Sequence, residues 1–430
     1  MGIALLVIGL IILTILALKG VPIIVASLVA GVFVLITAGM SIVDGISTSY
    51  MTGFSTYVKN YYIIFIFGAI FGKICEISGA TDSIAKTVVN KFGEKYVVLG
   101  IIIAAAILGF GGVSLFVALF ALYPLAMSLF RRADIPRRLF PGAYIAGAGT
   151  FAMTAPFSPS TQNIIPMQYL GTQLSAAAVP GIIGTVFCAI AVCIYMQWRV
   201  KQVKKAGEHF VPIPGEDFAV SDDSNLPNVI IALLPLVILI IVLNAFGLSV
   251  MTALFIGIVA AIIIYFKWLP HSFLEMWKHI SSGANNGIMS IINTAATVGF
   301  GSIVAATPAF ATLAALITNL AAGGNGLLMA GISVAMLAGI SGSASGGLGV
   351  AVPIVGQIFL PLGVNPQALH RVAVVSSSAL DSLPHNGFVN TCLNYSKTTH
   401  KEGYFDIFVV SILITIAETI IVIALCNIML

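Results

Sequence analysis

The chain has 430 residues, of which 59% are hydrophobic and only 8% are charged, and its formal net charge is +4. Soluble domains carry about 25% charged residues, so this composition excludes a soluble protein and indicates an integral membrane protein. The five cysteines have no metal-ligand spacing, and no nucleotide-binding or zinc motif occurs in the sequence. We therefore expect no cofactor and no nucleic-acid partner.

Apolar runs long enough to cross the hydrocarbon core of a bilayer, about 20 residues each, follow one another along the chain. The first run has no basic segment before it and no small-residue cleavage site after it, so we expect a retained span and not a signal peptide. The predicted spans are residues 2–18, 20–42, 60–80, 139–165, 176–198, 228–247, 249–268, 286–306, 368–391 and 405–428.

Two other apolar stretches, residues 97–130 and 326–360, are too long for one span and are interrupted by glycine and serine. The interruptions read "GFGGVS" at 109–114 and "SGSASGG" at 341–347. Each stretch predicts a re-entrant helical hairpin, which enters the membrane partway, turns, and leaves by the side that it entered.

One strongly polar segment, residues 199–227, divides the chain into two similar halves. It predicts a cytoplasmic linker between a first repeat at 1–198 and a second repeat at 228–430. Each half contains three spans, a re-entrant hairpin, a polar-interrupted span and a final span, in that order. The sequence therefore predicts an all-α polytopic membrane protein with an internal repeat.

The distribution of lysine and arginine predicts how the two halves are related. If the chain starts outside and the hairpins are re-entrant, all of these residues except Lys59 and Arg371 face the cytoplasm. Such asymmetry is what the positive-inside rule requires. Because an odd number of reversals then separates the halves, we expect two inverted repeats.

Four interruptions at membrane depth predict a binding site: residues 109–114, 155–163, 341–347 and 378–387. Backbone that leaves a helix inside the membrane must be buried in protein or line a cavity. In inverted-repeat transporters, broken helices meet near the midplane and present free N–H groups to an anionic substrate. The alternatives are a proline kink satisfied by nearby hydroxyls and, from Gly342 to Gly346, a small-residue packing motif.

Ionisable residues within the predicted spans are candidates for ion coupling, because burial of a charge in the membrane is costly. Asp381 lies deep in its span, and His385 follows it and titrates near neutral pH. The alternative for Asp381 is an acid held permanently by serine and backbone donors, or one that caps a half-helix. Arg371 either attracts an anion or snorkels to the interface. Glu418 is interpreted as a structural or lipid-edge residue.

Three stretches resemble the gluconate permease family, within the wider ion transporter superfamily. They are "GFGGVSLFVALFALYPLAMSLFRRADIPRRLFPGAYIAGAGTFAMTAPFSPSTQNIIPMQYLGT", "GISGSASGGLGVAVP" and "SSSALDSLPHNGFV". The resemblance covers nearly the whole chain and implies a homodimer with a scaffold and a mobile transport domain. It also implies transport of small hydroxy or keto acids such as gluconate and 3-hydroxybutyrate, generally with protons. The "SPST" stretch departs from the glycine and threonine pattern of gluconate transporters and leaves the exact acid open.

The resemblance also assigns the site residues. The substrate-binding residues that it implies are Gly112, Val113 and Ser114 at the first hairpin tip, Ser158, Ser160, Thr161 and Asn163 in the first broken span, Ser343, Ala344, Ser345 and Gly346 at the second tip, and Ser382 and Asn386 in the second broken span. The ion-coupling residues that it implies are Asp381 and His385.

The hypothesis from the sequence is a secondary active symporter of the bacterial inner membrane that imports a small organic anion with protons by elevator-type alternating access. A sodium-coupled carboxylate transporter is the first alternative, and an anion channel is the second, since serine-rich re-entrant loops also form selectivity filters. An intramembrane enzyme is disfavoured, because Ser343 and Ser345 have no base within their segment.

Overall fold

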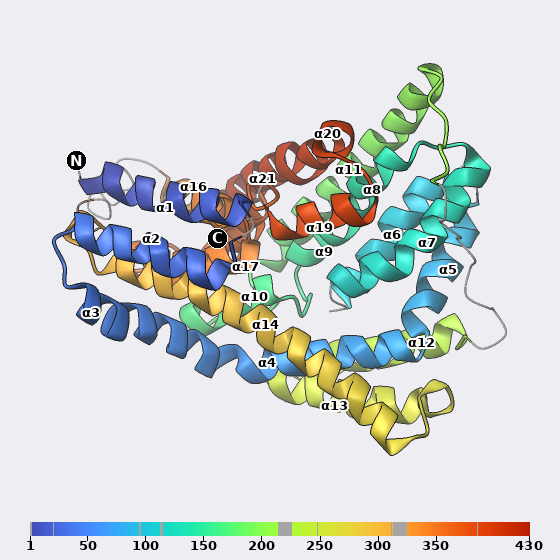
Figure 1. Ribbon diagram of the computed structural model, residues 1–430, viewed down its shortest axis with the longest axis horizontal. Helices are drawn as coiled ribbons and strands as arrows, with labels where there is room; N and C mark the ends of the chain where they lie inside the picture. Colours follow the sequence, from blue (N-terminus) through green and yellow to red (C-terminus); the bar gives the residue numbers. More distant parts are fainter. Residues whose placement is uncertain are drawn as a thin grey trace.

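The computed structural model describes residues 2–19, 21–93, 96–111, 115–213, 226–246, 248–310, 312, 325–384 and 386–430. The elements in these residues are helices, and no strand occurs among them (Figure 1). The predicted all-α class is therefore confirmed.

The first half of the chain begins with two apolar helices and continues into a long one. Its helices are α1 (Gly2–Leu18), α2 (Ile23–Thr37), α3 (Ile42–Asp44), α4 (Met51–Ile77), α5 (Ala80–Phe92), α6 (Val97–Phe110), α7 (Leu115–Ala133), α8 (Phe140–Ala148), α9 (Phe151–Thr154), α10 (Thr161–Leu170) and α11 (Ala178–Lys205). A π-helical segment, Gly45–Tyr50, joins α3 to α4, so that Ile42–Ile77 is one continuous helix.

The second half has the same order of long helices, paired helices and interrupted helices. Its helices are α12 (Val229–Asn244), α13 (Val250–Ile264), α14 (Phe273–Ala305), α16 (Gly326–Ser341), α17 (Ala344–Phe359), α18 (Pro366–Ser377), α19 (Gly387–Tyr395), α20 (His400–Phe408) and α21 (Ile414–Met429). A π-helical segment, Val409–Leu413, joins α20 to α21.

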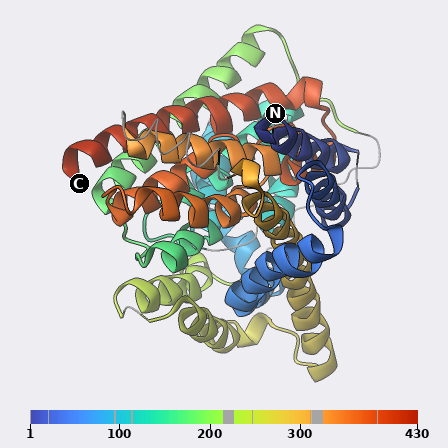
Figure 2. The ribbon, with the colours of Figure 1, turned by 90° about the vertical axis from the view of Figure 1, so that its left-hand side faces the viewer.

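The helices α1, α2, α4, α12, α13 and α14 form what we call the outer group. Its centre is the pair α4 and α14, the third long helix of each half, which run side by side (Figures 1 and 2). A Cβ atom on Gly287 of α14 would lie 2.8 Å from the carbonyl oxygen of Phe65 on α4. Since lipid tails are as apolar as leucine, helices associate in membranes largely through such close packing at small residues.

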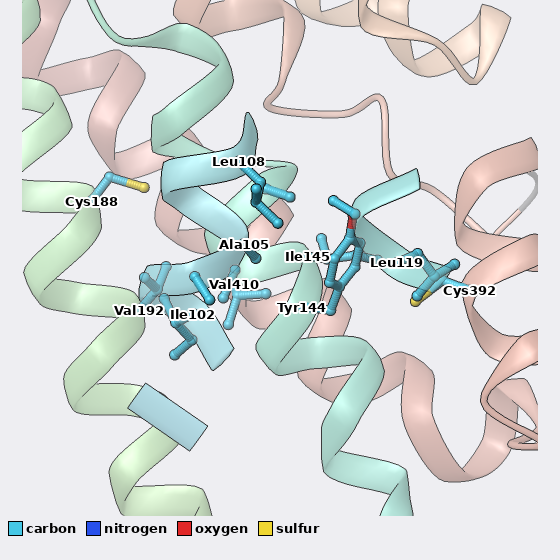
Figure 3. Close-up of a cluster of buried hydrophobic side chains, with 14 of the residues drawn as sticks. Ile102, Ala105, Leu108, Leu119, Tyr144, Ile145, Cys188, Val192, Cys392 and Val410 are labelled. Atoms are coloured by element: carbon cyan, nitrogen blue, oxygen red, sulfur yellow. The ribbon is translucent and has the colours of Figure 1, made fainter. Parts of the chain in front are cut away.

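The helices α6 to α11 and α16 to α21 form the second group, which we call the core group. In it α6 packs against α8, and α16 packs against α18. Figure 3 shows Ile102 of α6 and Tyr144 of α8 in the buried apolar cluster, with Val192 of α11 and Cys392 of α19 at its two sides. The Tyr144 hydroxyl donates to the carbonyl oxygen of Leu115 at 2.5 Å, which satisfies the one polar atom of this ring.

Both stretches predicted as hairpins fold as paired helices. The helices α16 and α17 are joined by a tight turn in which Gly342 has a φ of 59°, a left-handed conformation that favours glycine. A Cβ atom on Gly347 would overlap the backbone of Ala338 in the facing helix. The helices α6 and α7 also pack together. The re-entrant course of both pairs in the membrane stays a prediction.

The structure interrupts both spans that the sequence predicts to be broken. The first, residues 139–165, divides into α8, α9, a non-helical segment at 155–160, and α10. The second, residues 368–391, divides into α18 and α19, with residues 378–384 and 386 outside both helices.

Several predicted boundaries were wrong, because hydropathy detects only the apolar part of a helix and polar turns continue it into water. The span predicted at 60–80 belongs to a helix that starts at Ile42, and the span predicted at 286–306 belongs to α14, which starts at Phe273. The helix α5 was not predicted, and α11 continues to Lys205, inside the segment assigned to the linker.

Within the described residues, four helices are long and apolar enough to cross a membrane, judged by length and composition: Ile42–Ile77, Ala178–Lys205, Phe273–Ala305 and His400–Met429. The other predicted spans correspond to shorter apolar helices or to the interrupted ones.

Ion pairs hold the charged end of α11 and the residues after it against other parts of the core group. Arg199 donates from Nε to Oδ1 of the buried Asp406 of α20 at 2.5 Å. Beyond α11, Glu208 accepts two hydrogen bonds of 2.6 Å from the Arg138 guanidinium. These bonds hold the pKa of Glu208 below its usual range.

Candidate substrate-binding site

The first broken span has an extended segment between two helix ends. Pro156 and Pro159 lack backbone donors and disfavour a continuous helix here. Phe157 has a φ of 67°, which is strained for a residue with a side chain. Ser160 restarts the helix as the N-cap of α10: its hydroxyl donates to the carbonyl oxygen of Met153 at 2.6 Å and accepts from the backbone N–H of Asn163 at 3.4 Å.

Asn163, in the first turn of α10, is completely buried and holds the break together. Its side-chain amide donates to the carbonyl oxygen of Ala155 at 3.0 Å and to the Ser160 hydroxyl at 3.0 Å. Its side-chain oxygen accepts from Arg371 of α18 at 2.8 Å. Asn163 therefore connects the first broken span to the second half of the chain.

Arg371 is fully buried, and its guanidinium binds the first broken span and the loop that follows α10. Besides Asn163, it donates to the carbonyl oxygens of Thr154 at 2.8 Å, Leu174 at 2.9 Å and Ala176 at 3.0 Å. The planar fork of an arginine can serve several such acceptors at once. The interpretation of Arg371 as an interfacial snorkelling residue was wrong, because the side chain is enclosed by protein.

A cavity of about 640 Å³ lies beside this break, between the core group and the outer group. The core group contributes the N-terminus of α10, and the outer group contributes α4, α12, α13 and α14. Lys73 and Glu76 of α4, an ion pair of 2.6 Å, also line the cavity. The core-group residues that line the cavity are Gly109, Gly111, Leu115, Ala148, Met153, Pro159, Ser160, Thr161, Gln162 and Ile164.

The predicted residues of the first half differ in their relation to this cavity. Ser160 and Thr161 line it, whereas Asn163 lies behind them and braces the break. Ser158 is buried, and its hydroxyl has no hydrogen-bond partner among the described residues. The predicted Gly112, Val113 and Ser114 lie outside the residues that the structure describes.

The described members of the predicted set in the second half form a separate cluster at the tip of α16 and α17, and none of these described residues lines the cavity. Ser343 is the N-cap of α17: its hydroxyl accepts from the backbone N–H of Gly346 at 3.1 Å and lies 3.4 Å from the Ser345 hydroxyl. The Asn386 side-chain amide donates to the carbonyl oxygen of Gly342 at 3.0 Å. The second broken span is thereby joined to the second hairpin tip.

Asp381 is buried in this cluster, and three polar groups face its carboxyl group. The Ser382 hydroxyl donates to it at 2.9 Å, and the backbone N–H groups of Ser382 and Ala344 also face it. The contact to Ala344 places a carboxyl group at the N-terminus of α17, where it is favoured by the helix dipole. This is the geometry of the alternative in which Asp381 caps a half-helix. The predicted His385 lies outside the described residues.

Two further residues that line the cavity were not predicted from the sequence. Gln162 follows Thr161 in the first turn of α10, and Asn286 faces the cavity from α14. The signal for Asn286 was present as "GANNGIM", a polar pair within an apolar stretch. Polar residues at membrane depth are costly unless they serve a site or a partner.

A model of the GntP family permeases matches residues 1–429 of the chain. The chain belongs to the GntP permease family. This permease is 34% identical over 462 residues to the uncharacterized transporter YxjC of Bacillus subtilis, with 96% of each chain covered. It is 25% identical to the high-affinity gluconate transporter of Escherichia coli, with 90% of this chain and 87% of that one covered.

Two solved structures have the same fold as this GntP-family permease. The YdaH transporter of Alcanivorax borkumensis superposes with a TM-score of 0.57 over 89% of this chain and 87% of its own, at 14% identity. MtrF of Neisseria gonorrhoeae, described as one of a class of antimetabolite efflux pumps, has a TM-score of 0.52 at 13% identity. The predicted family is confirmed, and the chain is a multi-pass transporter of the bacterial inner membrane and not an enzyme.

Proposed function

We propose that this permease imports a small organic anion, a hydroxy or keto acid such as gluconate or 3-hydroxybutyrate, together with protons. The observation that carries the proposal is the cavity of about 640 Å³ that receives the N-terminus of α10. Its size lies within the range of small-molecule sites, about 300 to 1,000 Å³. The gluconate transporter named among its relatives supports an anion of this class.

The first turn of α10 has the chemistry that a carboxylate needs. The first N–H groups of a helix have no acceptor within the helix and carry a partial positive charge. Here Thr161 and Gln162 line the cavity at that turn, so backbone N–H groups, a hydroxyl and an amide converge on one wall. These neutral donors and acceptors suit both the carboxylate and the hydroxyl groups of a sugar acid.

The proposed mechanism is alternating access in which the core group moves against the outer group. The cavity lies between the two groups, as a site carried by one group past the other requires. Lys73 and Glu76 line the cavity, and we assign their side of it to the cytoplasm from the distribution of basic residues in the sequence. In this proposal the structure is read as an inward-facing state of one protomer, and the protein is a homodimer of inverted repeats.

In this proposal the tip of the hairpin α16 and α17 binds the anion in the outward-facing state. We assign the hydroxyls of Ser343 and Ser345 and the neighbouring Ser382 and Asn386 to the wall that closes over the anion when the core group faces outward. Ala344 and Gly346 contribute backbone to that wall. The predicted internal repeat supports this assignment, because "SGSASGG" has the same position in the second half of the sequence as "GFGGVS" has in the first half.

The test is uptake of labelled gluconate and 3-hydroxybutyrate into proteoliposomes, with Ser160→Ala and Thr161→Ala beside the wild type. A hydrogen bond to a charged group contributes about 1.5 to 3 kcal/mol, so each variant should raise KM roughly tenfold or more. The matched control is Ser47→Ala, since the Ser47 hydroxyl is exposed and bonds only to the Val43 carbonyl oxygen in its own helix. An unchanged KM in both site variants would remove α10 from the site.

The same vesicles identify the coupling. An inward proton gradient should accelerate saturable uptake, while a sodium gradient alone should leave it unchanged. Acceleration by sodium would favour the sodium-coupled alternative, and unsaturable conductive flux would favour a channel.

A further inference from the structure

A buried carboxyl group lies outside the cavity and has no part in the site described above. Glu418 of α21 is completely buried. The Cys188 thiol and the Thr154 hydroxyl face its carboxyl group. Even so, neither carboxyl oxygen has a well-formed hydrogen bond to any residue in the described part of the chain. A carboxyl group in such surroundings is a functional candidate, because a structural one would have its partners.

Glu418 and Arg371 lie against one face of α11, about one helical turn apart. A Cβ atom on Gly181 would lie 2.9 Å from Nε of Arg371, and one on Gly184 would lie 3.4 Å from Cγ of Glu418. Residues separated by three positions are neighbours on a helix surface. The two glycines therefore make the space in which the cation and the acid lie near each other.

The hydrogen bonds of Arg371 leave its charge without a counter-charge. Its four acceptors, three carbonyl oxygens and the side-chain oxygen of Asn163, are all neutral. A buried cation is costly unless an opposite charge compensates it. Glu418 is the carboxyl group that interacts with it electrostatically.

Few other titratable groups face this pair from the surrounding helices. Cys188 of α11 faces Glu418, and Cys426 of α21 faces Arg371. His370, the neighbour of Arg371 on α18, is bonded through Nδ1 to the Thr172 hydroxyl at 2.6 Å. The sequences of α9 and α16, which pack nearby, contain no acidic, basic or cysteine residue.

The pair is connected to the cavity by two short routes. Arg371 donates to Asn163, which follows Thr161 and Gln162 in the first turn of α10. Thr154 faces Glu418, and its neighbour Met153 lines the cavity. An anion at the N-terminus of α10 is thus one residue from a ligand of the cation, and the acid is one residue from the cavity wall.

We propose that Glu418 is the proton-binding site of the transporter, an inference that rests on the proton-coupled anion uptake proposed above. When no anion is bound, the negative charge of the Glu418 carboxylate compensates the positive charge of Arg371. When the anion binds near α10, the charge of the anion compensates Arg371 instead. The Glu418 carboxylate then accepts one proton from the aqueous cavity and becomes the neutral acid. The buried charge is then the same in both states, and anion and proton each increase the affinity for the other by the same factor.

Two measurements on purified protein test the inference. Wild-type protein in detergent should take up about one proton per bound gluconate or 3-hydroxybutyrate, and its affinity should rise roughly tenfold for each unit that the pH falls. Glu418→Gln mimics the neutral acid, so it should bind the anion with no proton uptake and a flat pH profile. In vesicles the variant should exchange labelled for unlabelled anion but should not accumulate it under a proton gradient.

Glu275→Gln is the matched control, because Glu275 lies exposed at the start of α14 and should keep every wild-type property. If Glu418→Gln still accumulates the anion under a proton gradient, the inference is overturned while the proposed function stands. If the wild type shows no proton-stimulated uptake of either acid, the proposed function itself fails. If Glu418→Gln does not fold, Glu418→Asp carries the test: it should keep proton uptake with a displaced midpoint pH, and an unchanged midpoint would overturn the inference.

Discussion

Three charged side chains within the core group differ in how their surroundings satisfy them. Arg371 has four neutral acceptors, and Asp381 has a hydroxyl and two backbone N–H groups. Each of these two side chains stabilises the non-helical segment of a broken span. Glu418 is as buried as the other two, but only a thiol and a hydroxyl face its carboxyl group, and neither forms a well-aligned hydrogen bond. An ionisable residue in a membrane is thus more informative when its hydrogen bonds are counted than when only its depth is known.

The ion pair of Glu208 with Arg138 lies outside the membrane spans and should make the stability of the protein depend on pH. Because its pKa is lower in the folded protein than its ordinary value of 4.5, its bond to Arg138 stabilises the fold above that pH and is lost as the pH falls through the folded value. The pair is partly exposed, so Glu208→Gln should cost below about 1 kcal/mol at pH 7. Thermal unfolding of the two proteins in detergent should differ most from pH 5 to 7 and converge at lower pH. A difference that widened in acid would contradict this assignment.

Local sequence was enough to predict part of the site. The Pro-Ser pattern placed Ser160 and Thr161 in a broken helix, and the structure puts both on the cavity. It was not enough for Arg371, whose acceptors lie 195 to 217 residues away along the chain. A contact between residues so far apart leaves no local pattern in the sequence. The sequence therefore shows that burial of Arg371 in the membrane is costly, but it does not show which groups bind it.

At the scale of the elements, glycine decides how closely the helices approach. The hairpin of α16 and α17 depends on Gly347, where any side chain would overlap Ala338. Overpacking a tight contact costs about 1 to 3 kcal/mol. Gly347→Ala should therefore lower the thermal stability of the protein and reduce uptake, because the second tip would be displaced.

Gly387→Ala is the control for this prediction, because a Cβ atom there would meet no atom within 4 Å. It should leave unfolding temperature and uptake unchanged. Equal stability of the two variants would show that the hairpin can open at no cost, contrary to the packing described above.

The existence of most elements could be predicted, because apolar length and glycine interruptions are local properties of a chain. Their ends could not, as α14 and α11 show: both continue through polar turns whose backbone hydrogen bonds are as good as those in the apolar part. The helix α5 was not predicted because it is amphipathic and of mixed composition, and such a helix has no continuous apolar run.

At the scale of the whole molecule, each group of helices contains elements of both halves. The outer group joins α1, α2 and α4 to α12, α13 and α14, and the core group joins α6 to α11 with α16 to α21. The polar segment at 199–227 divides the sequence but not these groups. A movement of one group against the other therefore has to occur along contacts such as that between α14 and α17.

A disulfide across that contact tests the movement. A Cβ atom on Gly301 of α14 would lie 3.1 Å from Cβ of Val350 on α17, a few tenths of an ångström below the usual disulfide separation of about 3.5 to 4.5 Å. In a background without native cysteines, Gly301→Cys with Val350→Cys should stop uptake when oxidised and recover it on reduction. Uptake that persists in the oxidised protein would rule out sliding at this contact.

The control pair lies within the core group. Gly331→Cys with Ser376→Cys joins α16 to α18, where a Cβ atom on Gly331 would lie 2.9 Å from the Ser376 hydroxyl oxygen. Because both helices belong to the same group, oxidation of this pair should leave uptake intact.

The bonds of Arg371 also bear on how the protein is made. The ribosome adds the four acceptors, which are the carbonyl oxygens of Thr154, Leu174 and Ala176 and the side-chain oxygen of Asn163, 195 to 217 residues before it adds the arginine that binds them. During that interval the segment has polar backbone that lipid does not tolerate. We therefore expect these polar groups to stay hydrated, or sheltered by the insertion machinery, until α18 emerges. Assembly of the core is in this sense a late event of biosynthesis, completed only when both halves are present in the membrane.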